Sequence, residues 1–121
     1  MIILYVADQQ RSKVFYEKIL KKKPLLDVQG MTEFLLTDNF KLGLMPEDGI
    51  EKILTPHTSH PKLGNGIPRC EFYLFVDDPE EMLRLAVSAG AKEISKSKIR
   101  DWGDMAAYCA DPDGHIITFA K

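Results

Sequence analysis

A short motif occurs twice in the chain, and this repeat constrains the fold more than any other feature. LYVAD at residues 4–8 returns as LFVDD at residues 74–78, 70 residues later. Each copy is an apolar run suited to a buried strand, and each ends in aspartate. A helical pattern and three strand-like segments follow each copy. The distance is too long for a solenoid unit and indicates an internal duplication of a half-domain.

The first half predicts a strand at residues 2–6 and a helix at residues 9–20. Asp8 is placed to cap the helix, because its carboxylate can accept from backbone N–H groups of the first turn. Helical spacing puts Val14, Phe15 and Ile19 on one apolar stripe. Further strands are expected at residues 24–29, 32–37 and 40–45.

The second half predicts the same order, beginning with a strand at residues 70–76. Asp78 and Pro79 fit the cap and the first position of a helix, and Gly90 fits the position just after its end. Further strands are expected at residues 92–97, 104–110 and 115–120, with a turn at Asp111-Pro112-Asp113-Gly114.

Between the halves, residues 46–68 are rich in proline and glycine and carry little periodicity. They predict a connector, with 47–68 as a linker or lid loop, because long loops in small domains are often mobile or functional. A lid would lose protease accessibility when a ligand binds.

Composition limits the classes of protein to which the chain can belong. A chain of 121 residues with 45% hydrophobic residues predicts a single domain with its own core. Its net charge of −2 does not indicate the basic surface that proteins use to bind nucleic acid. No apolar run approaches the roughly 20 residues of a membrane span. Cys70 and Cys109 lie in apolar, strand-like stretches, which favours unpaired thiols and a cytoplasmic location over a disulfide.

Two longer strings carry a family resemblance: VADQQRSKVFYEKIL at residues 6–20 and WGDMAAYCADPDGHIITFA at residues 102–120. They resemble the first strand–helix element and the last two strands of the vicinal oxygen chelate superfamily, which includes glyoxalases, bleomycin-resistance proteins and extradiol dioxygenases. The resemblance implies an α+β fold of two β-α-β-β-β modules, here 1–46 and 69–121, whose curved mixed sheets form a cup within a single domain. It also implies a homodimer.

Many members of that superfamily hold a divalent metal, and the resemblance maps the ligand positions onto Met1, Glu71 and Thr118. Only Glu71 is a competent ligand for such an ion. His57 and His60 lie in the proline-bracketed loop, and alternation points His115 away from the face of Thr118. We therefore predict no metal and no other cofactor, as in the bleomycin-resistance-like members.

If these positions mark the cup, alternation adds Ile3 and Tyr5 on the first strand and Ile116 on the last. On the fifth strand it adds Tyr73 and Phe75 to Glu71, while Trp102 either contacts ligand or anchors the core. Buried among aromatic rings, Glu71 needs a partner: a ligand's cation, Arg69, Arg100, a proton, or a group at a dimer interface. The predicted ligand-binding residues are Tyr5, Glu71, Tyr73, Phe75, Trp102 and Thr118.

Three functions remain open. The first is a small-molecule-binding protein with a degenerate metal site that sequesters an aromatic or cationic compound. The second is a metal-dependent lyase, isomerase or dioxygenase with a rearranged site that uses Glu71 and loop histidines. The third is a dimeric interaction module with a vestigial cup. A bound divalent ion would favour the second, and a filled cavity the third.

Overall fold

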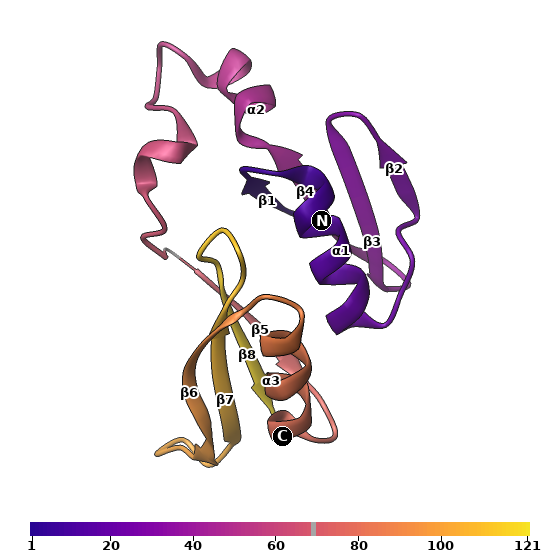
Figure 1. Ribbon diagram of the computed structural model, residues 1–121, viewed down its shortest axis with the longest axis vertical. Coiled ribbons are helices and arrows are strands. Elements are labelled where there is room, and N and C mark those ends of the chain that lie inside the picture. Colours follow the sequence, from indigo (N-terminus) through magenta and orange to yellow (C-terminus); the bar gives the residue numbers. More distant parts are fainter. Residues whose placement is uncertain (69) are drawn as a thin grey trace. The chain divides into compact units, whose positions relative to one another are not determined.

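The computed structural model describes residues 1–68 and 70–121, and the chain divides into two compact units, residues 1–65 and 66–121. The first unit contains β1 (Ile2–Val6), α1 (Gln9–Leu20), β2 (Leu26–Val28), β3 (Met31–Thr37), β4 (Phe40–Pro46), α2 (Glu47–Leu54) and η1 (Pro61–Gly64), a 3-10 helix (Figure 1). The second contains β5 (Glu71–Phe75), α3 (Pro79–Ser88), β6 (Lys92–Ile99), β7 (Met105–Ala110) and β8 (Ile116–Ala120).

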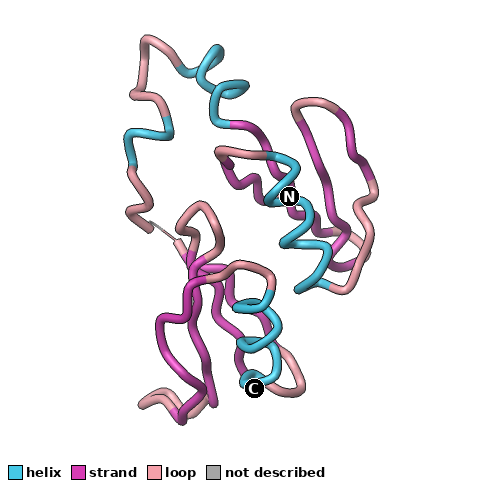
Figure 2. The backbone as a smooth tube through the Cα atoms, viewed as in Figure 1, coloured by secondary structure: helices cyan, strands magenta, loops and turns pink. Residues whose placement is uncertain are grey.

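Each unit builds one mixed sheet, and the two sheets have the same topology. Their strand orders are β1-β4-β3-β2 and β5-β8-β7-β6. In both, the first strand pairs in parallel with the last, and the remaining neighbours pair antiparallel. The element order in each unit begins with a strand and a helix and continues with further strands, which Figure 2 colours by type. The predicted α+β class with two β-α-β-β-β modules is therefore confirmed.

Helix α1 begins where the sequence predicted. The Asp8 carboxylate accepts from the backbone N–H of Arg11 at 2.9 Å. The predicted apolar stripe is partly wrong, because Val14 is 54% exposed. The buried face instead comprises Ser12, Phe15, Tyr16 and Ile19, whose spacing is that of one helix face. Tyr16 is fully buried beside Phe15.

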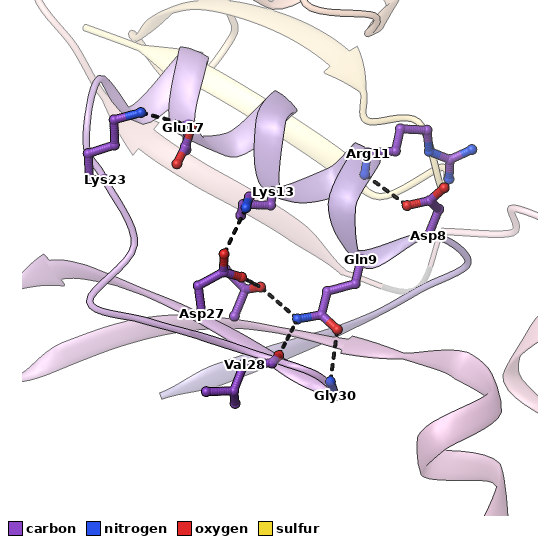
Figure 3. A network of polar contacts seen from close by, with 10 residues as sticks. Asp8, Gln9, Arg11, Lys13, Glu17, Lys23, Asp27, Val28 and Gly30 are labelled. Carbon is purple, nitrogen blue, oxygen red and sulfur yellow. Dashed lines mark hydrogen bonds and ion pairs between the residues drawn. The ribbon is translucent and has the colours of Figure 1, made fainter.

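Polar contacts hold the start of α1 to the hairpin of β2 and β3 (Figure 3). The Gln9 amide donates to the carbonyl of Val28 at 2.7 Å and accepts from the backbone N–H of Gly30 at 3.0 Å. One turn on, the Lys13 ammonium lies 2.7 Å from the Asp27 carboxylate. The hydrogen bond from Lys13, then that from the Thr32 hydroxyl, lowers the pKa of Asp27 below its usual value.

The core of the second module lies between α3 and one face of its sheet. The Asp78 carboxylate caps α3 by accepting from the backbone N–H groups of Glu80 and Glu81 at 3.1 and 3.0 Å. Gly90 follows the C-cap at φ +112°, a conformation that glycine adopts without strain. Leu83 and Ala86 are buried on the helix. Strands β7 and β8 contribute the buried side chains of Ala107, Cys109, Ile117 and Phe119.

The connector is more ordered in structure than the sequence indicated. Helix α2 opens with Glu47 and Asp48 in its first turn, where acidic side chains favour the positive end of the helix dipole. Ile50 is buried on this helix. The predicted loop over residues 47–68 was therefore wrong for α2 and η1. Gly49 inside the helix and Pro46 before it concealed the pattern, because both residues usually interrupt helices.

The prediction of two unpaired thiols is confirmed. Cys70 is exposed, Cys109 is buried, and neither forms a disulfide. Among the described residues, no helix is long and apolar enough to cross a membrane.

Candidate ligand-binding face

Four of the six predicted binding residues lie on one face of the second module's sheet. Glu71, Tyr73 and Phe75 alternate along β5, and Thr118 on β8 is the Cα partner of Tyr73. Ile117 and Phe119, the neighbours of Thr118, turn to the opposite face and are fully buried there. Alternation therefore assigned the faces of β5 and β8 correctly.

Tyr73 connects this face to the loop between β6 and β7. Its hydroxyl donates to Asp104 Oδ2 at 2.7 Å and accepts from the Trp102 indole N–H at 3.3 Å. The hydrogen bond to the Asp104 carboxylate is the largest cause that raises the pKa of Tyr73 above its usual value. The Tyr73 ring meets Phe75 edge to face, with centroids 5.5 Å apart. Trp102, the fifth predicted residue, thus joins the other four.

Backbone geometry places Trp102 and Asp104 on either side of a turn. Gly103 sits at φ +105°, in the left-handed region that favours glycine. Its N–H donates to the carbonyl of Arg100 at 3.0 Å, and the N–H of Arg100 donates to the carbonyl of Asp104 at 2.9 Å. These bonds close the end of the hairpin and fix the carboxylate that Tyr73 reaches.

Glu71 differs from its prediction, because it is exposed rather than buried among rings. Its carboxylate accepts from the Thr118 hydroxyl at 3.1 Å, and Thr118 itself is fully buried. Arg100 does not pair with Glu71. Its guanidinium donates to the carbonyl of Ala106 at 2.7 Å and lies 4.8 Å from the Tyr108 ring centroid. Arg69, the other expected partner, lies outside the described residues.

Sequence reasoning missed Asp104, although it lies two residues from Trp102. Tyr108 on β7 is a Cα partner of Thr118 and lies on the same face. Phe75 and Trp102 are 75% and 57% exposed. In the described chain, no lysine or arginine forms an ion pair with Glu71 or Asp104. Among the described residues, the face therefore combines open aromatic rings with two carboxylates that have no basic partner.

The sixth predicted residue, Tyr5, belongs to the first module. It lies on β1 as the Cα partner of Met45, and Ile3 on the same strand opposes Gly43. Their neighbours Leu4 and Val6 turn to the other face and are buried. Tyr5 therefore lies, within its own sheet, on the face opposite the buried residues of β1.

The donor set does not fit the divalent ion that the resemblance implies. The Thr118 hydroxyl already donates to Glu71, which leaves the carboxylate as a hydrogen-bond acceptor. A neutral hydroxyl and the Met1 thioether are poor ligands for hard or borderline ions. His60 lies 3.1 Å from Asp48, and His115 lies 2.9 Å from Asp111. Within residues 1–68 and 70–121, no three His, Cys, Asp or Glu side chains gather in a metal-binding group.

Comparison with known proteins places this fold. The sequence model of the glyoxalase-like domain matches residues 1–121. A glyoxalase-related enzyme from Fulvimarina pelagi has a TM-score of 0.83 at 20% identity, over 98% of this chain and 84% of its own. A glyoxalase/bleomycin resistance protein/dioxygenase family enzyme from Burkholderia phytofirmans has a TM-score of 0.81 at 14% identity, over 98% and 94%.

A bleomycin-binding protein in complex with bleomycin also shares the fold, with a TM-score of 0.62 at 22% identity, over 98% of this chain and 93% of its own. A search of curated protein sequences gives no match.

Proposed function

Because this chain belongs to the family of glyoxalase-like domains, we propose that it binds and sequesters a small molecule that is both cationic and aromatic, without a catalytic metal. One observation carries the proposal: the exposed rings of Phe75 and Trp102 share a face with the carboxylates of Glu71 and Asp104. Sequestration requires only such a surface, and it needs no nucleophile or acid–base pair.

The chemistry of this face favours a cation attached to a ring. A cation over an aromatic face gains about 0.5–1 kcal/mol when exposed and about 2 kcal/mol when desolvated. A carboxylate nearby adds a charge-assisted contact. The hydrogen bonds from Tyr73 and Thr118 hold the two carboxylates in place before a ligand arrives, which lowers the ordering cost of binding.

Trp102 provides the assay, because it is the protein's single tryptophan. We would titrate phenyltrimethylammonium, its neutral analogue tert-butylbenzene, and bleomycin, the last because a solved structural neighbour binds it. The proposal expects a saturable change in Trp102 fluorescence with phenyltrimethylammonium or bleomycin and a weaker one with tert-butylbenzene.

Matched variants separate charge from packing. We expect Glu71→Gln or Asp104→Asn to weaken cation binding about tenfold, which corresponds to about 1.4 kcal/mol. Glu93→Gln is the control, since Glu93 is exposed and its Cα partner Cys109 lies on the helix-covered face. Equal binding of the neutral and charged compounds, or equal losses in all three variants, would contradict the proposal.

Elemental analysis of untagged protein decides between this proposal and the enzymatic alternative. About one tightly held Mn, Fe, Ni or Zn per chain, lost in Glu71→Ala, would replace this proposal with a metal-dependent lyase, isomerase or dioxygenase.

Membership of the family also leads us to propose a homodimer, for which light scattering should give about twice the chain mass of 13.7 kDa. We propose a cytoplasmic location on the strength of the two unpaired cysteines.

A further inference from the structure

The methionines of the first module gather beside one face of its sheet. Of the five methionines, Met1, Met31 and Met45 belong to the first module, and Met82 and Met105 to the second. Met45 follows Gly43 on β4 by two residues, so the two share one face of the sheet. Met31 precedes Glu33 on β3 by two residues, and Glu33 is the Cα partner of Gly43. Three thioethers are therefore associated with the sheet face that carries Tyr5.

Two of these sulfurs converge on one point. A Cβ atom added at Gly43 would lie 3.4 Å from Met1 Sδ and 3.4 Å from Met31 Sδ. The two sulfurs are consequently no further apart than twice that distance. Gly43 has no side chain between them, and Ile3 Cγ1 lies 3.1 Å from the same point, so even a methyl group there would be crowded. We call this narrow space beside the Gly43 backbone the cradle.

We propose that this cradle binds a soft monovalent metal ion, Cu(I) or its redox-inert analogue Ag(I), through the thioethers of Met1 and Met31. Thioether sulfur selects Cu(I) over hard divalent ions. Methionine side chains have three rotatable bonds, so both sulfurs can close on one ion without backbone movement. The binding is simple coordination, with no redox step and no proton released.

The charged side chains on this face favour the binding of a monovalent ion over a divalent ion. Glu33 places a carboxylate near the cradle, but Lys41 lies 2.7 Å from that carboxylate and neutralises it. Two neutral sulfurs replace the hydration of a divalent ion poorly, whereas a monovalent soft ion loses less hydration on entry.

The alternative is that these methionines only fill space in an apolar layer. Burial argues against this alternative, because Met1 is 56% exposed and Met31 and Met45 are only partly buried. Side chains that serve purely as filler are expected inside the core, where Leu42 and Leu44 of the same strand are fully buried.

The test uses the full chain with Cys70→Ser, because the exposed thiol of Cys70 would otherwise capture the ion. With methionine methyl groups labelled with carbon-13, silver nitrate is titrated in chloride-free buffer and the five methyl signals are followed. We expect the Met1 and Met31 signals to shift together and saturate at one ion per chain, while the Met82 and Met105 signals stay in place. Zinc should move none of them.

Variants assign the ion to the cradle. Met31→Leu conserves volume, so the module should stay folded, and we expect at least a tenfold loss of Ag(I) affinity. Met105→Leu is the matched control, because Met105 is an exposed methionine of the other module. Affinity unchanged in Met31→Leu, a shift of Met105 equal to that of Met31, or an equal response to zinc would each overturn the proposal.

Discussion

The two cysteines should differ in reactivity by orders of magnitude. Burial, and then the nearby Asp111 carboxylate, raises the pKa of the Cys109 thiol from 9.0 to about 12. At pH 8, a thiol with a pKa of 9 is about 10% thiolate and one with a pKa of 12 about 0.01%, so ionisation alone slows Cys109 about a thousandfold. Its full burial adds the requirement that the module opens before a reagent can enter.

An aromatic disulfide reagent that releases a coloured thiol measures both groups. In native protein at pH 8 we expect one thiol per chain to react quickly, and in denatured protein two. The variant Cys70→Ser should lose the fast phase entirely. Two fast thiols in the native wild type would refute the reasoning, because Cys109 would then lie on an open face of β7 and the assigned strand register would be wrong.

Three further changes test the energetics of the fold, each by urea unfolding. Asp78→Ala removes the acceptor for two N–H groups of α3 and should destabilise the protein by about 1 kcal/mol, whereas Asp77→Ala should change the free energy of unfolding by less than about 0.5 kcal/mol. Phe119→Ala should cost about 3–5 kcal/mol, since Phe119 is fully buried, and Phe75→Ala, on the opposite and open face, should cost far less; equal costs would contradict the assigned faces. Because the folded pKa of Cys109 lies above its usual value, its contribution is complete below pH 9 and falls as pH rises toward 12. Between pH 8 and 10 the wild type should lose about 1 kcal/mol more than Cys109→Ala does, and identical losses would refute the assignment.

Local sequence signals predicted the helix starts well. An aspartate before a helix caps it through a bond only a few residues long, so Asp8 and Asp78 could be recognised without tertiary information. Val14 was misplaced because a twelve-residue helix with few apolar residues leaves the phase of its buried face ambiguous. Packing against the sheet selected Ser12 and Tyr16 instead.

The geometry of the candidate face was predicted only in part, for related reasons. Alternation along β5 predicts which face of the sheet Glu71 and Tyr73 share, but not how exposed their side chains are. Strand β5 is an edge strand of the β5-β8-β7-β6 sheet. Within this sheet only β8 lies beside it, and Glu71 stays exposed. Asp104 reaches Tyr73 across 31 residues of chain through a glycine turn, a contact that periodicity cannot reveal.

The Trp102 indole N–H signal in a nitrogen-15 correlation spectrum tests the proposed binding face most directly. The protein has one tryptophan, so one indole signal reports on the group that donates to Tyr73. Titration with phenyltrimethylammonium should move this signal along a saturable curve, and the movement should weaken in Asp104→Asn. Binding detected by calorimetry with the indole signal unmoved would place the ligand elsewhere and contradict the account.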